Sequence, residues 1–263
     1  QDLLGAPSTL KSLTATKSET VEIWGGLAGQ AFTITAPLDA SLKTVSADTA
    51  QGGVFVGNLV LDVSANGHSQ ALAFTGGSGN DKINTGDAWG DGDVFKGGAN
   101  YNGGVDEIWM HFQTLTDGTR AATMSGFEVA HVTFSAPESF EGGMVDDLKT
   151  VNLYASAPRA DFNAMDSTLD TLNISGNLGG GVEVDYDGKA AATLNIDILD
   201  ATSSIGNAGN KAAVRVINAD TVNLTHKGTA AVTLSNGLQV DDVFANGRST
   251  SRVNVVNNSN SNL

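Results

Sequence analysis

The sequence predicts an all-β fold, and within that class a β-solenoid, meaning a parallel β-helix or β-roll. Three observations lead to this prediction: a glycine–aspartate turn motif at residues 76–84, a short strand pattern that returns about every 20 residues, and a lack of helical periodicity. No segment longer than about ten residues holds a 3.6-residue apolar pattern, so helices should be few and short. In a solenoid, each coil buries its apolar face against the neighbouring coils.

The turn motif has the sequence Gly-Gly-Ser-Gly-Asn-Asp-Lys-Ile-Asn over residues 76–84. This is a full match to Gly-Gly-x-Gly-x-Asp-x-apolar-x, a calcium-binding repeat of parallel β-helices. The glycines let the backbone adopt positive φ angles, so that successive carbonyl groups can point inward. Because Ca²⁺ takes six to eight oxygen ligands, a turn with free carbonyls beside Asp81 suits it.

Two less regular copies of this motif follow. Residues 93–98 have the order Asp-x-apolar-x-Gly-Gly, and residues 103–108 end with Ile108 two places after Asp106. The aspartates at positions 81, 93 and 106 are 12 and 13 residues apart instead of 9, so the units contain insertions. The alternative is a cluster of Gly- and Asp-rich turns that joins strands without a metal.

The strand pattern is an apolar residue followed by Thr-apolar-x-apolar. Its copies are Leu148–Leu153, Leu169–Ile174, Ala192–Ile196, Asp220–Leu224 and Arg252–Val255. Alternation with period two indicates strands with one buried face, and the spacing between Thr150, Thr171 and Thr193 indicates coils of about 20 residues. The Asn between the apolar residues should point outward or form a stacked ladder. A β-sandwich is the alternative architecture, and the calcium motif favours the solenoid over it.

The predicted organisation has four parts. Residues 1–70 form an N-terminal β segment, which lacks the strand signature and for which a small β-sandwich-like part is an alternative. Residues 71–112 form the calcium-binding turns, residues 113–256 form the solenoid repeats, and residues 257–263 are an Asn/Ser-rich tail or linker. The chain begins with Gln1 and shows no signal peptide, so we expect a fragment or a processed product.

Composition narrows the classes of partner. The 263 residues include 14 Lys and Arg against 29 Asp and Glu, which gives a net charge of −15. This charge disfavours nucleic acids and anionic membranes and favours metal cations. Without any cysteine, disulfides, thiol catalysis and thiolate metal sites are excluded, and a metal is the usual substitute staple. No apolar run approaches the about 20 residues of a transmembrane helix.

The glycine–aspartate motif resembles the RTX (repeats-in-toxin) proteins, which bacteria export by type I secretion. The resemblance implies that the carbonyl groups of Gly76, Gly77, Ser78 and Gly79 bind Ca²⁺ together with the Asp81 carboxylate. By the same mapping, neighbouring turns would contribute Asp93, Gly97, Gly98 and Asp106. The uneven spacing departs from the regular RTX pattern.

The later strand repeats make the resemblance more specific. The order of the calcium motif, a Gly-Phe-Glu-Val step at residues 126–129 and repeated Thr-Val-Asn-Leu strands resembles RTX surface-layer (S-layer) proteins over residues 55–256. This family implies a calcium-dependent structural protein of the extracellular cell surface, which self-associates into a two-dimensional lattice. The strand motif is shared with RTX adhesins, so an adhesin domain that binds lipopolysaccharide or a surface glycan is the alternative.

Catalytic motifs are weak, and we expect a protein that is not an enzyme. Residues 67–71 resemble a nucleophile elbow at Ser69, but the calcium motif follows too closely to leave room for the helix that an elbow requires. No His-Glu-x-x-His is present, which excludes that class of zinc protease. A secreted RTX hydrolase or a polysaccharide lyase is the least favoured alternative. Its candidates are Asp146, Asp147, Asp241 and Asp242 with Arg159, Lys211 or Arg215, whereas Trp24, Trp89, Tyr101 and Trp109 are candidate glycan platforms.

Overall fold

The computed structural model describes most of the chain, in fourteen segments. These are residues 8–13, 19–23, 30–47, 58–64, 71–90, 92–100, 103–114, 122–166, 168–187, 192–199, 204–206, 211–229, 231–241 and 252–257. They contain the strands β1 to β23 and one short 3-10 helix, η2 (Gly142–Met144). The chain divides into two compact units: unit 1 comprises residues 1–110, 115–130 and 144–147, and unit 2 comprises residues 111–114, 131–143 and 148–263.

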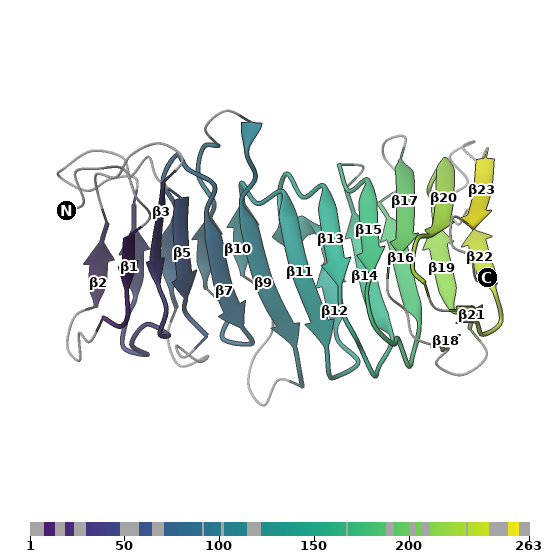
Figure 1. Ribbon diagram of the computed structural model, residues 1–263, viewed down its shortest axis with the longest axis horizontal. Coiled ribbons are helices and arrows are strands. Elements are labelled where there is room, and N and C mark those ends of the chain that lie inside the picture. Colours follow the sequence, from purple (N-terminus) through teal and green to yellow (C-terminus); the bar gives the residue numbers. More distant parts are fainter. Residues whose placement is uncertain are drawn as a thin grey trace. The chain divides into compact units, whose positions relative to one another are not determined.

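Unit 1 is built from two parallel sheets whose strands alternate along the chain (Figure 1). One sheet has the order β1 (Ser8–Leu10), β3 (Ala31–Ile34), β5 (Asn58–Asp62), β7 (Lys82–Gly86) and β9 (Glu107–Phe112), of which residues 107–110 belong to unit 1. The other has the order β2 (Thr20–Glu22), β4 (Thr44–Ser46), β6 (Ala73–Thr75), β8 (Val94–Lys96) and β10 (Thr123–Ser125). Each coil therefore adds one strand to each sheet.

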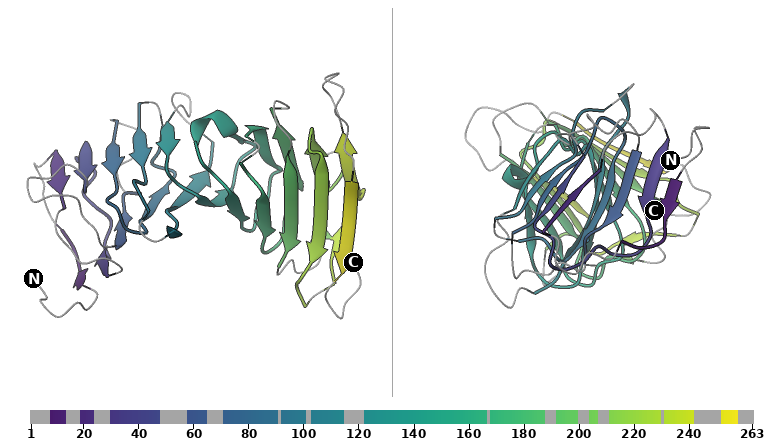
Figure 2. Two further views of the ribbon diagram at one scale, coloured as in Figure 1. Left: turned by 90° about the horizontal axis from the view of Figure 1, so that it is seen from above. Right: turned by 90° about the vertical axis from the view of Figure 1, so that its left-hand side faces the viewer.

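Unit 2 has the same construction, as the stacked arrows in Figure 2 also show. Its first sheet contains residues 131–134 of β11 (Val129–Phe134), then β13 (Thr150–Leu153), β15 (Thr171–Ile174), β17 (Thr193–Ile198), β20 (Thr221–His226) and β23 (Arg252–Asn257). Its second sheet contains β12 (Ser139–Glu141), β14 (Ala160–Met165), β16 (Val182–Tyr186), β19 (Val214–Ile217) and β22 (Leu238–Asp241), and β18 (Ser204–Ile205) pairs with β21 (Thr233–Leu234). The predicted β-solenoid is confirmed.

Within residues 1–70, the described strands belong to the parallel sheets of the solenoid. They continue these sheets, because β3 pairs with β5 and β5 pairs with β7, while β4 pairs with β6. The Thr-apolar-Asn-apolar signature is missing there, but the alternation of buried and half-buried residues in β5 is the same as in the later coils. The alternation, and not the signature, is what a solenoid coil requires.

Strand alternation places apolar side chains inside each unit and polar ones outside. In β15, for example, Leu172 and Ile174 are buried while Thr171 and Asn173 are partly exposed. The interior of unit 2 includes paired aromatic rings: Phe112 stacks on Phe134 with 4.5 Å between ring centroids, and Phe140 lies tilted against Phe162 with 5.6 Å between centroids. Aromatic pairs at such distances add to the stabilisation from buried area.

The asparagines of the strand motif form stacked ladders on the outer face of unit 2, which confirms one of the two arrangements expected for them. Asn173 donates from Nδ2 to Asn152 Oδ1 at 2.8 Å. In a second ladder, Asn223 donates to Asn195 at 2.8 Å and Asn254 donates to Asn223 at 2.6 Å, in each case from Nδ2 to Oδ1.

Between β15 and β17, the copies of the strand motif are not in register. The motif aligns Thr171 with Thr193, whereas the structure pairs Thr171 with Asn195, a slip of two residues. A two-residue slip leaves every side chain on its own face of the sheet, so the apolar pattern tolerates it. In the described residues, no helix is long and apolar enough to cross a membrane.

Candidate metal centre

The first glycine–aspartate motif forms the turn between β6 and β7, and Asp81 is fully buried in it. Its Oδ1 accepts a hydrogen bond from the Leu59 backbone N–H at 2.7 Å, and its Oδ2 accepts one from the Gly77 N–H at 2.8 Å. Gly76, Gly77 and Gly79 are buried in the same turn, and Ser78 is half-buried. Asp81 therefore satisfies backbone donors with both of its oxygens.

Asp93 makes the same kind of contact at the start of β8. Its Oδ1 accepts from the Leu72 N–H and its Oδ2 accepts from the Gly90 N–H, both at 2.7 Å. Leu72 and Asp93 hold equivalent positions in successive coils, because Ala73 pairs with Val94. Asp93 is thus brought to the sheet that contains β6 and β8, whereas Asp81 lies at the sheet that contains β5 and β7.

Asp106 differs from both of these aspartates. Its Oδ1 accepts from the Asp81 backbone N–H at 2.6 Å, but its Oδ2 has no hydrogen-bond partner although the residue is 0% exposed. A buried polar atom without a partner is energetically unfavourable and rare in folded proteins. The Oδ2 atom of Asp106 is therefore the best-placed oxygen in this region to bind a cation.

Two residues that the sequence prediction missed complete this centre: Asn100 and Glu128. Glu128 Oε2 accepts from the Asp106 backbone N–H and from Asn100 Nδ2, each at 2.9 Å. The other side-chain atom of Asn100, Oδ1, is also buried and without a hydrogen-bond partner. Both unpaired oxygens thus belong to residues that are bound to one glutamate carboxylate.

Strand register explains why these acids meet. In β5, β7 and β9, Val60 pairs with Lys82 and Lys82 pairs with Glu107, so the residues just before them also stand side by side. These residues are Leu59, Asp81 and Asp106. In the coil after Asp106, the Val129 N–H donates a hydrogen bond to the Asp106 carbonyl oxygen. Glu128, which directly precedes Val129, therefore follows Asp81 and Asp106 in a column of acidic residues, one from each successive coil. The only sequence signal for it was the Gly-Phe-Glu-Val step, which has no aspartate and does not match the calcium motif.

The glycines of the turns are required by close packing around these carboxylates. Gly97 has no room for a side chain, since a Cβ atom there would lie 2.0 Å from the Gly126 carbonyl oxygen and 2.6 Å from Asp106 Oδ2. One coil earlier, a Cβ atom at Gly76 would lie 2.0 Å from the Gly97 carbonyl oxygen and 2.4 Å from Asp81 Oδ2. In both coils, the space where the glycine side chain would be is bordered by a carbonyl oxygen and a carboxylate oxygen.

Gly98 belongs to the same packed region, and its φ of 113° is one that other residues rarely adopt. A Cβ atom on it would lie 2.2 Å from the Gly77 carbonyl oxygen. The structure thus brings Gly76, Gly77, Gly97 and Gly98 close to Asp81 and Asp106.

Burial dominates the electrostatics of the centre. It raises the pKa of Asp81 to about 6 and that of Asp106 to about 7. For Asp106 the negative charges of Asp81 and Glu128 raise the pKa further, against the lowering effect of the hydrogen bond from the Asp81 N–H. A cation beside these groups would favour their charged forms.

The donor set fits calcium better than a transition metal. It consists of carboxylate, amide and carbonyl oxygens, which hard cations prefer. No group of three or more His, Cys, Asp or Glu side chains suited to a metal occurs in the part of the chain that the structure describes. Backbone carbonyls and the Asn100 amide would therefore have to supply several of the ligands.

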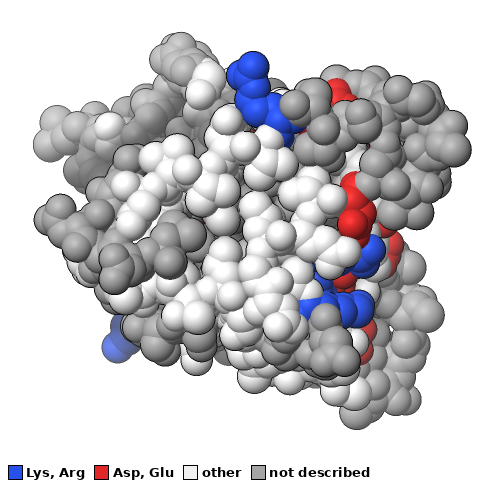
Figure 3. Space-filling model, turned by 90° about the vertical axis from the view of Figure 1, so that its right-hand side faces the viewer, with Lys and Arg blue, Asp and Glu red and all other residues white. Residues whose placement is uncertain are grey.

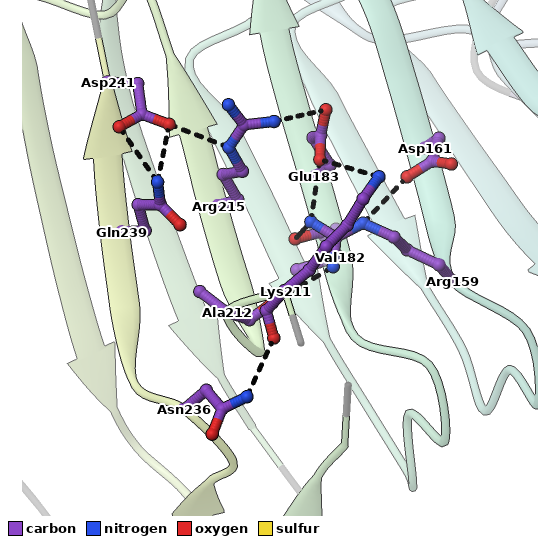
Figure 4. Close-up of polar contacts among 10 residues, drawn as sticks. All are labelled: Arg159, Asp161, Val182, Glu183, Lys211, Ala212, Arg215, Asn236, Gln239 and Asp241. Carbon is purple, nitrogen blue, oxygen red and sulfur yellow. Dashed lines mark hydrogen bonds and ion pairs between the residues drawn. The ribbon is translucent and has the colours of Figure 1, made fainter. Parts of the chain in front are cut away.

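The charged residues considered for a lyase are partly brought together in unit 2 (Figure 4). Nitrogen atoms of Arg159, Arg215 and Lys211 lie 2.9, 3.3 and 3.9 Å from the Glu183 carboxylate. Arg159 and Arg215 also form ion pairs with Asp161 at 3.0 Å and with Asp241 at 2.8 Å, respectively. Three cations thus face three carboxylates, and this network joins β14, β16, β19 and β22.

The other candidate residues lie apart from this network or outside the described residues. Asp146 and Asp147 belong to unit 1, where Asp147 has a φ of 70° that is typical of a turn. Trp89 is fully buried. Asp242, Ser69, Trp24 and Tyr101 lie outside the residues that the structure describes.

Comparison of the chain with protein-family models, with curated proteins and with solved structures found no match.

Proposed function

We propose that the chain is a calcium-dependent structural protein of the bacterial cell surface, and that it forms or anchors an S-layer by self-assembly. The observation that supports this most directly is the buried Asp106 Oδ2 atom without a partner, beside Glu128 and the unpaired oxygen of Asn100. Asp106, Asn100, Glu128 and the Gly126 carbonyl would hold the Ca²⁺ ion. The ion would supply positive charge to a turn region that buries two carboxylates with raised pKa values.

Calcium binding would be coupled to folding. A metal that binds the folded chain and not the unfolded chain stabilises the fold according to its free concentration. With a net charge of −15, the metal-free chain also repels itself. The proposal includes secretion by the type I route. Scarce calcium inside the cell would keep the chain unfolded, and abundant calcium outside the cell would complete its folding.

Self-association is supported by strand β23 of unit 2. Among the strands that the structure describes, it stands last in its sheet and pairs with β20. All six of its residues are exposed, including Val253 at 46%, Val255 at 54% and Val256 at 44%. Figure 3 shows this side of the molecule, on which the described atoms are mostly neither acidic nor basic. An exposed strand edge with apolar side chains is a template for pairing with another chain, and we assign that chain to a second copy.

The test combines calcium titration with electron microscopy. We expect calcium to raise the melting temperature of the chain and to produce ordered sheets or chains in negative stain, and EGTA to abolish both. Asp106→Asn should weaken the calcium-dependent rise in melting temperature, because it removes a charged ligand. Asp147→Asn is the matched control, since it makes the same charge change at an exposed turn residue in unit 1.

Three outcomes would contradict the proposal. A melting temperature that does not respond to calcium would rule out the metal centre, and an equal response in wild type and Asp106→Asn would rule out this residue as a ligand. Identical monodisperse particles in calcium and in EGTA would rule out calcium-dependent self-assembly. The role is proposed as non-enzymatic, and turnover of lipid esters or uronic-acid polymers would favour the hydrolase or lyase alternative. The adhesin alternative, with lipopolysaccharide or a surface glycan as partner, is a separate proposal.

A further inference from the structure

A shallow depression of about 470 Å³ lies on the outer face of the large sheet in unit 1. Its lining residues come from β3, β5, β7 and β9 and from Thr35 just after β3. These strands are neighbours in one sheet (Figure 1). The side chains that line it combine hydroxyl, carboxylate, amide, aliphatic and indole groups: Thr33, Val60, Asp62, Lys82, Asn84 and Trp109. Apolar and aromatic surface with a few placed polar groups is the usual composition of a small-molecule site.

Three of these residues form one row across the sheet. Asp62 pairs with Asn84, and Asn84 pairs with Trp109, in neighbouring parallel strands. Since adjacent strands are about 4.8 Å apart, the row spans about 10 Å. A carboxylate, an amide and an indole therefore follow one another along a line that is long enough for more than one sugar ring.

The polar part of the row is held in place before any ligand binds. Asp62 Oδ1 accepts from the Ser64 N–H at 2.9 Å and from the Ser64 hydroxyl at 2.5 Å. Asn84 Nδ2 donates to Asp62 Oδ2 at 3.2 Å, and Asn84 Oδ1 accepts from the Gly86 N–H at 3.1 Å. Because a primary amide has two N–H groups and a carboxylate oxygen accepts more than one hydrogen bond, both residues keep capacity for a ligand.

A β-bulge positions the indole. The register shifts between Asn84 and Gly86, which pair with the consecutive residues Trp109 and Met110, so Thr85 is an extra residue. Thr85 is buried and donates from its hydroxyl to the Trp109 carbonyl oxygen at 2.8 Å. Gly86 completes the bulge with a φ of 54°. Bulges are enriched beside binding sites, where they redirect a side chain.

The charges in the depression disfavour an acidic ligand. Lys82 Nζ lies 2.7 Å from Glu107 Oε1 and 5.7 Å from the centroid of the Trp109 ring, so its charge is compensated while it helps to orient the indole. Asp62 adds a negative charge, and the whole chain is strongly acidic. A neutral ligand with many hydroxyl groups meets no such repulsion.

We propose that this depression binds a neutral oligosaccharide. One pyranose ring would pack its C–H face on the Trp109 indole, and hydroxyl groups of the same or the next ring would hydrogen-bond to Asp62, Asn84 and Thr33. Trp is suited to this role because it presents a large, rigid apolar face. This inference gives the adhesin alternative a site and a ligand class, and it does not depend on the metal centre or on self-assembly.

The test is isothermal titration calorimetry of the whole chain in calcium. The probes are neutral oligosaccharides of glucose, mannose or N-acetylglucosamine, with oligogalacturonate as the acidic comparison. We expect at least one neutral series to bind, and Trp109→Leu to weaken that binding at least about tenfold. Leucine keeps apolar bulk on the sheet, so the variant should stay folded. Asn84→Ala should cause a smaller loss, of about fivefold.

Tyr154→Leu is the matched control, because Tyr154 is an exposed aromatic residue that belongs to unit 2, whereas the half-buried Trp109 belongs to unit 1. It should bind the saccharide like the wild type. The proposal is overturned if no neutral oligosaccharide binds, if oligogalacturonate binds as tightly as the neutral series, or if Tyr154→Leu loses as much affinity as Trp109→Leu. Neither Trp109→Leu nor Asn84→Ala should change the calcium response, so failure here is distinguishable from failure of the structural role.

Discussion

Asp81 and Asp106 hold equivalent positions in successive coils, yet their carboxylates are used differently. Asp81 accepts a backbone N–H with each oxygen, whereas Asp106 accepts one N–H with Oδ1 and leaves Oδ2 without a partner. The sequence motif is more complete at Asp81, but the unpaired oxygen lies at the less regular copy. The residue that best fits a cation is therefore not the one with the best motif.

Gly97 allows a test of the close packing at the centre. We expect Gly97→Ala to lower the free energy of unfolding by about 1–3 kcal/mol, because the new Cβ would meet the Gly126 carbonyl oxygen at 2.0 Å. Chemical denaturation with and without calcium measures this change. Gly143→Ala is the control, since a Cβ there has nothing within 4 Å. Equal stability of the two variants would show that the turns are not packed as described.

Strands and turns were predictable to different degrees. The alternation of apolar residues sufficed for the strands, because a face of a sheet is set by period two. The turns could be predicted only where close packing leaves no room for a Cβ atom and glycine is therefore required, as at Gly76 and Gly97. Glu128 and Asn100 could not be found, because their place beside Asp106 depends on how many residues each coil contains. The same dependence explains the two-residue slip at Thr171.

The asparagine ladder of β17, β20 and β23 should contribute measurably to the stability of unit 2. Asn223 takes part in two of its side-chain hydrogen bonds, donating to Asn195 and accepting from Asn254. Asn223→Ala should therefore lower the free energy of unfolding by about 1–2 kcal/mol. Asn254→Ala removes one bond and should lower it by about half as much. An Asn254 variant as destabilised as the Asn223 variant would argue against a ladder of independent bonds.

At the scale of the whole molecule, the exposed strand β23 leads to a prediction about assembly. Val255→Lys places a charge on the most exposed valine of that strand, and charges on edge strands prevent pairing with other chains. We expect the variant to stay monomeric in calcium while its melting temperature still rises with the metal. Sedimentation velocity measures the mass. Tyr154→Lys, at an exposed position away from this edge, should assemble normally, and loss of assembly in it would remove β23 as the contact.

The column of buried acids has a consequence for the order in which the chain folds. Asp81 accepts from the amide of Leu59, Asp106 from that of Asp81, and Glu128 from that of Asp106. In each case the acceptor comes from the coil that follows, so a buried donor stays unsatisfied until later residues are in place. Unit 1 is thus directional: each of these coils needs a carboxylate from the next coil before its own buried amide has an acceptor. If the C-terminal part of the chain becomes available first, the acceptor for each of these buried amides is already present when the amide appears. If the N-terminal part becomes available first, each amide lacks its acceptor until the next coil has appeared.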